Sequence, residues 1–119
     1  MEKSTIRVIV AGGRDFADYT FLKSKLDKLF SEKTVIVVSG MAKGADSLGE
    51  RYAHENKLVV SYFPALWHKF GTQAGFIRNT EMAKNADACV CFWDGKSVGT
   101  KHMIDTAEQM NLNLRVIHY

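Results

Sequence analysis

Three strand-like runs of sequence each end in glycine just before a segment with helical periodicity. The runs occupy residues 6–11, 35–38 and 88–93, and the glycine-containing segments after them are residues 12–14, 39–46 and 94–100. Glycine lets a ligand approach the backbone closely, and free amides at a helix N-terminus favour anions. Loops that follow parallel strands share one edge of an open sheet. We therefore expect the three loops to form one site for a nucleotide or another phosphorylated ligand.

The apolar pattern alternates between strand and helix along the whole chain. Helical spacing occurs in residues 22–30, with Asp18 as a candidate cap, and again in residues 45–53, 74–85 and 103–110. Further strands are expected at residues 58–62 and 114–117. Strands of nearly unbroken valine and isoleucine suit a sheet that is covered on both faces. The pattern predicts an α/β fold: a three-layer, doubly wound, Rossmann-like parallel sheet of about five strands in the order 3-2-1-4-5.

The length and net charge of the chain indicate how many domains it forms and which partners it binds. A chain of 119 residues is expected to form one nucleotide-binding domain over residues 1–119. The net charge is only +3, and no concentrated basic stripe is visible, so nucleic acid is the less favoured partner. No apolar leader or membrane-length apolar run is present, which predicts a cytoplasmic protein without membrane contact. The sequence leaves a homo-oligomer open.

Several common cofactor and metal signatures are missing from the sequence. Arg14 and Phe16 stand where a dinucleotide fingerprint needs glycine, and no Walker lysine is present, so no cofactor is expected. Cys89 and Cys91 fall on the same face of one predicted strand and are expected to be buried free thiols. The four histidines have no ligand spacing, so we expect no metal site.

Five ordered blocks resemble the SLOG superfamily, which unites DprA/Smf proteins with the LOG phosphoribohydrolases. The resemblance is greatest to the small YspA-like branch. The blocks are residues 12–16, residues 39–46, residues 63–65 with Trp67, residues 74–82, and Gly99 with Thr100. The resemblance implies a Rossmann-like domain that binds nucleotides or nucleotide-derived ligands. Some members cleave the N-glycosidic bond of nucleoside monophosphates, and others sense nucleotides or bind single-stranded DNA.

The loops and the resemblance together give a set of candidate ligand-binding residues. Gly40, Gly44 and the amides around Ala45 are expected to hold a phosphate at a helix start, so that a branched side chain at Gly44 would block the ligand with little loss of stability. The full set is Gly12, Gly13, Arg14, Gly40, Lys43, Gly44, Ala45, Asp46, Trp67, Arg78, Asn79, Gly95, Ser97, Gly99 and Thr100.

Four of these residues have two predicted roles. Arg14 suits a phosphate, or it pairs with a nearby carboxylate such as Asp15 or Asp46. Asp46 contacts a ribose hydroxyl or caps its helix, and Thr100 binds phosphate or caps the last helix. Trp67 stacks on a base or covers the edge of the sheet.

Catalytic residues are harder to assign. The hydrolase branch of the superfamily that this chain resembles carries the pattern P-G-G-x-G-T-x-x-E after the fourth strand and an Arg-Lys pair on the preceding helix. In this sequence Met103 stands at the position of the glutamate, and Asn79 stands at the position of the lysine. Methionine cannot handle a proton as a carboxylate does. Binding as a sensor or accessory protein is therefore the leading prediction. A nucleotide hydrolase with a relocated carboxylate is the alternative, with Arg78, Glu81, Asp94 and Asp105 as candidates. A further alternative is single-stranded DNA binding through Arg14, Lys43, Lys69 and Lys101.

Overall fold

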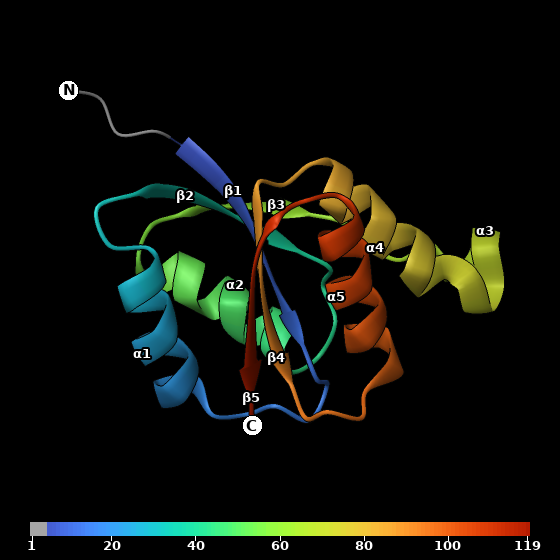
Figure 1. The fold of residues 1–119 in the computed structure, drawn as a ribbon, viewed down its shortest axis with the longest axis horizontal. Coiled ribbons are helices and arrows are strands. Elements are labelled where there is room, and N and C mark those ends of the chain that lie inside the picture. Colours follow the sequence, from blue (N-terminus) through green and yellow to red (C-terminus); the bar gives the residue numbers. More distant parts are fainter. Residues whose placement is uncertain (1–4) are drawn as a thin grey trace.

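A computed structural model of the protein describes residues 5–119 as one five-stranded sheet flanked by helices (Figure 1). The elements alternate as predicted. They are β1 (Thr5–Gly12), α1 (Tyr19–Leu29), β2 (Thr34–Ser39), α2 (Ala45–Glu55), β3 (Val59–Tyr62), α3 (Trp67–Phe70), the 3-10 turn η1 (Gly71–Gln73), α4 (Ala74–Lys84), β4 (Ala88–Trp93), α5 (Val98–Gln109) and β5 (Asn113–His118).

All neighbouring strands are parallel, in the order β3-β2-β1-β4-β5, which confirms the predicted topology. The first strand is central, with Val8 opposite Val37 on one side and opposite Ala88 on the other. The chain therefore changes winding direction between β1 and β4. The carboxyl ends of these two strands form the switch point where open α/β sheets bind ligands.

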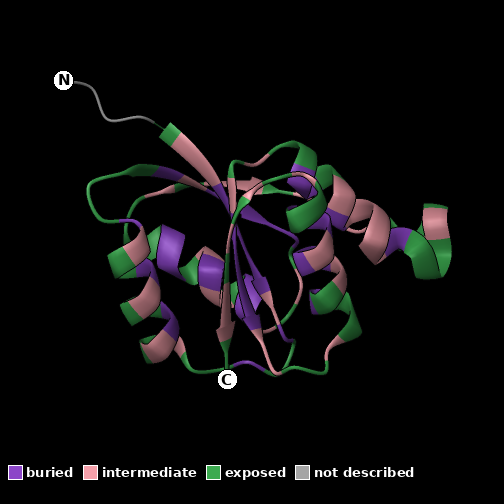
Figure 2. Ribbon diagram, in the orientation of Figure 1, coloured by how far each residue is buried: buried purple, intermediate pink, exposed green. Residues whose placement is uncertain are grey.

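Successive residues of β1 face opposite layers of the core. Val8 and Val10 pack with residues of α1 and α2, whereas Ile9 and Ala11 pack with residues of α4 and α5. Figure 1 shows these two helix pairs on opposite sides of the sheet. Figure 2 shows that the buried residues follow the central strands and the helix sides that face them. Both faces of the sheet are covered, as the continuous valine and isoleucine runs predicted.

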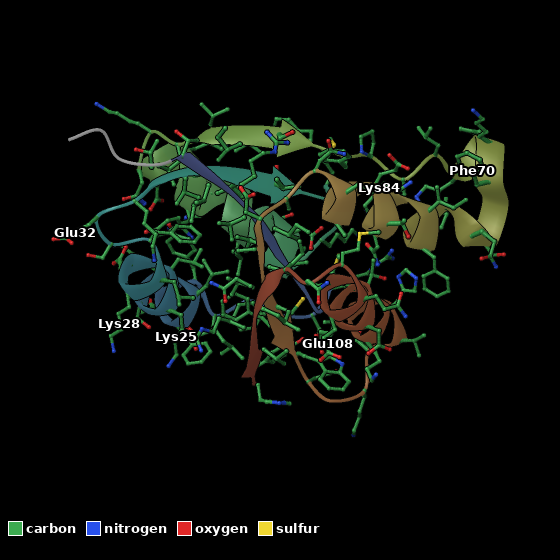
Figure 3. All side chains as sticks on the ribbon, turned by 45° about the horizontal axis from the view of Figure 1, so that its top comes forward. Lys25, Lys28, Glu32, Phe70, Lys84 and Glu108 are labelled. Carbon is green, nitrogen blue, oxygen red and sulfur yellow. The ribbon has the colours of Figure 1, made fainter. Side chains whose placement is uncertain are left out.

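The start and the charged face of α1 also agree with the sequence pattern. The carboxylate of Asp18 accepts a hydrogen bond from the Phe21 amide at 3.0 Å, so this predicted cap is confirmed. Lys23 pairs with Asp27 across one turn at 2.9 Å. Figure 3 shows Lys25 and Lys28 reaching away from the sheet. The charged residues of this helix therefore form a solvated face.

The segment between β3 and α4 differs from the prediction. No helix was predicted between residues 62 and 74, yet this segment contains the four-residue helix α3 and the turn η1. Helix α3 projects from the body of the protein (Figure 1), and Figure 3 labels Phe70 on this helix. A helix this short has little sequence signal of its own.

The two cysteines are buried free thiols, as predicted, and their sulfur atoms lie 3.5 Å apart. The contact with Cys89, together with burial, raises the pKa of the Cys91 thiol. Among residues 5–119, no cluster of three or more His, Cys, Asp or Glu side chains could hold a metal ion. No helix in that range is long and apolar enough to cross a membrane.

Candidate functional site

A cleft of about 450 Å³ opens at the carboxyl ends of β1 and β4. It is bounded by the β1–α1 loop, the start of α2, the α3–α4 region and the β4–α5 loop. Eleven of the residues singled out in the sequence line it: Gly12, Gly13, Arg14, Asp46, Trp67, Arg78, Asn79, Asp94, Ser97, Gly99 and Thr100. Gly40, Lys43, Gly44, Ala45, Glu81, Gly95 and Asp105 do not line it.

Gly12 of the first loop is required by chain packing, because an added Cβ would meet backbone, whereas one on Gly13 would meet the end of an exposed side chain. A Cβ on Gly12 would lie 2.3 Å from the Phe92 carbonyl oxygen, and one on Gly13 would lie 1.8 Å from the Tyr119 hydroxyl. The Gly13 amide donates to the Phe92 carbonyl at 3.0 Å. This hydrogen bond holds the loop against β4, and the loop places Arg14 at the cleft.

Gly44 and Ala45 of the second loop pack against the first loop, whereas Ala42 and Asp46 of the same segment line the cleft. A Cβ on Gly44 would lie 2.1 Å from the Gly13 carbonyl oxygen, and the Ala45 amide donates to that same oxygen at 3.1 Å. Gly44 therefore gives room to the protein's own backbone and not to a ligand. The expectation that a larger residue here leaves stability intact is wrong, because the added carbon meets backbone.

Asp46 is a buried carboxylate at the cleft, with 4% of its surface exposed. It does not cap α2, since Gly44 occupies the N-cap position. Its Oδ2 accepts a hydrogen bond from the Ala42 amide at 3.3 Å. Burial raises the pKa of Asp46 to about 6, although nearby Arg78 opposes that shift. Asp46 is therefore a proton-binding group close to neutral pH.

Two arginines face the cleft from different elements. Arg78 of α4 donates from Nη1 to the Gly40 carbonyl oxygen, and exposed Arg14 comes from the β1–α1 loop. Burial lowers the pKa of Arg78, and repulsion from Arg14 lowers it further, although Asp46 opposes this. Within residues 5–119, neither arginine forms an ion pair. Asp15, the suggested partner of Arg14, instead accepts a hydrogen bond from the Tyr119 hydroxyl at 2.6 Å. The cleft thus contains two guanidinium groups without an ion-pair partner among the described residues.

Asn79 connects α4 with α5. Its Oδ1 accepts from Arg78 Nε at 3.1 Å, and its Nδ2 donates to the Gly99 carbonyl oxygen at 3.4 Å and lies 3.1 Å from His102 Nδ1. The His102 ring stacks on Phe76 with centroids 4.3 Å apart, and burial lowers its pKa. Sequence reasoning missed the roles of His102 and Phe76, because the histidine and the asparagine are 23 residues apart.

The third loop is shaped by its own side chains. Asp94 Oδ1 accepts from the amides of Lys96 and Ser97, both at 2.8 Å, and these bonds lower the pKa of Asp94. Ser97 caps α5 by accepting from the Thr100 amide at 3.4 Å, and its Oγ also accepts from the Thr100 hydroxyl at 3.0 Å. Thr100 is therefore not the cap of α5. The first amides of a helix have no intrahelical partner, and Gly99 of this first turn lines the cleft.

The other candidate carboxylates lie outside the cleft. Glu81 is exposed and pairs with Lys84 at 3.6 Å, and Asp105 pairs with Lys101 at 2.6 Å. Met103 lines the cleft at the position where the hydrolase branch has glutamate, and it is almost fully buried. Asp15, Asp46 and Asp94 are thus the carboxylates of the cleft.

An aromatic side chain stands at the rim. Trp67 of α3 lines the cleft and is half exposed. A Cβ on Gly75 would lie 3.6 Å from Trp67 Cη2 and 3.8 Å from Arg78 Nη2. Glycine at this position leaves the space between the indole and the guanidinium open. Lys43 and Lys69 are exposed residues that do not line the cleft.

This architecture defines a Rossmann-like α/β protein with a polar cleft at the switch point of its sheet. The chain belongs to the YAcAr family (YspA, cpYpsA-related SLOG family), whose sequence model matches residues 6–70. This match confirms the resemblance seen in the sequence blocks. Arg78, Asn79, Gly99 and Thr100 lie beyond the matched residues.

Two further similarities extend the comparison. The chain is 34% identical over 114 residues to the gene 61 protein of Mycobacterium phage D29, covering 89% of this chain and 91% of the phage protein. The structure is similar to DNA processing protein A (DprA) from Streptococcus pneumoniae, with a TM-score of 0.78 and 16% identity. That similarity covers 94% of this chain but only 50% of DprA. At this identity, it shows a shared fold.

Proposed function

We propose that the protein binds a nucleotide or nucleotide-derived ligand in this cleft, acting as a sensor or an accessory protein. The observation that carries the proposal is the pair of arginines, Arg14 and Arg78, which face one cleft without an ion-pair partner among residues 5–119. Two guanidinium groups can each donate paired hydrogen bonds to phosphate oxygens. The phosphate lies between them, where the amides at the start of α5 add further donors.

The rest of the cleft suits the remainder of such a ligand. Its volume of about 450 Å³ falls in the range of small-molecule sites. The Trp67 ring gives a base a surface for stacking, and Gly75 keeps the path from Trp67 to Arg78 clear. Family membership supports the same ligand class. A small ligand is favoured over single-stranded DNA, because Lys101 is paired with Asp105 and the exposed lysines Lys43 and Lys69 stand outside the cleft.

Calorimetry against nucleoside monophosphates, ADP-ribose, NAD and cyclic nucleotides tests this function. We expect saturable binding of at least one of these ligands and a matching rise in melting temperature. Absence of both heat and thermal shift across the panel would refute the proposal.

Hydrolysis of an N-glycosidic bond is the second candidate, and burial of Asp46 at the cleft is the observation that favours it. A carboxyl group that titrates close to neutral pH is suited to donating and accepting protons. Chromatography of nucleoside monophosphates incubated with the protein would detect the free base. Bound nucleotide that is recovered intact would leave binding as the only activity of the cleft.

A further inference from the structure

Asp46 sits where several charged groups meet at the floor of the cleft. The charged or titratable groups that face it are Arg78 of α4, Glu50 one turn further along α2, and Cys91 of β4. Arg14 stands beyond Arg78 on the β1–α1 loop. The Glu50 carboxylate accepts a hydrogen bond from the Ser39 hydroxyl at 2.6 Å, so Glu50 already has a polar partner within the protein. Asp46 is the carboxylate that an anion beside Arg78 would meet.

Arg78 and Asp46 share one small space over Gly40 without forming an ion pair. A Cβ on Gly40 would lie 2.7 Å from Arg78 Nη1 and 2.8 Å from Asp46 Oδ2. Arg78 Nη1 donates to the Gly40 carbonyl oxygen, and no Arg78–Asp46 pair within 4 Å occurs among residues 5–119. Arg78 therefore keeps donors for a ligand, and Asp46 is left buried with incomplete compensation of its charge.

A phosphate that binds to Arg78 places a second negative charge close to this buried carboxylate. Two like charges that share a poorly hydrated site raise the proton affinity of one of them. A protonated carboxyl group removes the repulsion and also donates a hydrogen bond to a phosphate oxygen. Because burial already brings the pKa of Asp46 to about 6, uptake of this proton requires little free energy near neutral pH.

We infer that Asp46 takes up a proton when an anion binds beside Arg78, so that the cleft holds phosphorylated ligands more tightly as the pH falls. This inference rests on the proposed function. Asp46 then determines at which pH the cleft binds an anion. Ionised Asp46 repels an anion beside Arg78, and protonated Asp46 donates a hydrogen bond to it.

Inorganic sulfate is the probe for the test, since it keeps its double charge throughout the range studied. We expect sulfate affinity to fall about tenfold from pH 7 to pH 8, the dependence for one proton taken up on binding. Calorimetry in two buffers of different ionisation enthalpy should count the same proton. Asp46→Asn should abolish the dependence. Glu50→Gln, which alters the next carboxylate on the same helix, should retain it.

Carbon-13 NMR of the Asp46 carboxyl group in the wild-type protein gives a readout that needs no variant. We expect it to titrate close to pH 6 without sulfate and at higher pH with it. Titration near pH 4, or sulfate binding without proton uptake, would overturn this inference and leave the proposed function standing. Absence of sulfate and nucleotide binding at every pH would overturn both.

Discussion

Gly44 and Gly95 allow a matched test of how the first two loops are held together. Both residues have positive φ angles, +77° and +84°, so an alanine at either position incurs backbone strain of at least about 1–2 kcal/mol. The ψ angle of Gly44, −126°, also lies outside the left-handed helical region, so the strain at Gly44 is the larger. They differ in surroundings. A Cβ on Gly95 would have no atom within 4 Å among its described neighbours, whereas one on Gly44 would meet the Gly13 carbonyl oxygen at 2.1 Å.

The clash at Gly44 adds two costs to the shared strain. The β1–α1 loop must move away from α2, which resembles overpacking of a core and costs about 1–3 kcal/mol. That movement also breaks the hydrogen bond from the Ala45 amide to the Gly13 carbonyl, which is worth about 1 kcal/mol. We expect Gly95→Ala to lower the free energy of unfolding by about 1 kcal/mol and Gly44→Ala by at least about 3 kcal/mol.

Equilibrium unfolding in urea, monitored by circular dichroism, measures both variants. If Gly44→Ala and Gly95→Ala proved equally stable, the contact between the two loops would not have the structural importance assigned to it. Retained stability together with lost ligand binding in Gly44→Ala would favour the contrary view, in which this glycine makes room for the ligand.

Two further predictions concern the polar groups of the cleft. Native Asp46 holds its proton more tightly than the unfolded chain does, with a pKa of about 6 against 3.8, so its ionisation lowers the free energy of unfolding by about 2 kcal/mol as the pH rises from 4 to above 6. Asp46→Asn should lack this loss, and a stability difference from wild type that is the same at pH 4 and pH 7.5 would contradict the assignment. Asn79→Asp keeps an acceptor for Arg78 but replaces the amide that faces His102 with a carboxylate, so proton NMR should show the His102 pKa raised. An unchanged His102 titration would show that the two side chains do not interact in solution.

The fold followed from local patterns because each strand carries its own signal. Residues 88–93 were predicted as a strand with the observed bounds, and the helix capped by Asp18 begins where its cap indicated. The topology then placed Arg14 and Gly99 at the same edge of the sheet.

The parts that sequence reasoning missed depend on contacts between distant segments. The direction that Gly44 faces is set by the Gly13 carbonyl of another loop. The contact of Asn79 with His102 joins two helices through side chains that no local spacing relates. The proton affinity of Asp46 comes from burial, which its short-range sequence context does not reveal.

Binding of a nucleotide by Arg14→Ala, Arg78→Ala and Lys43→Ala variants tests the central claim most directly. Lys43 is the matched control, because it is an exposed cation on a neighbouring loop that does not line the cleft. With the tightest ligand from the panel, we expect each arginine variant to lose about 1.5–3 kcal/mol of binding free energy, the range for charge-assisted hydrogen bonds. The Lys43 variant should bind like the wild type. Equal affinities in all three variants, or a loss confined to Lys43→Ala, would contradict a phosphate site between Arg14 and Arg78.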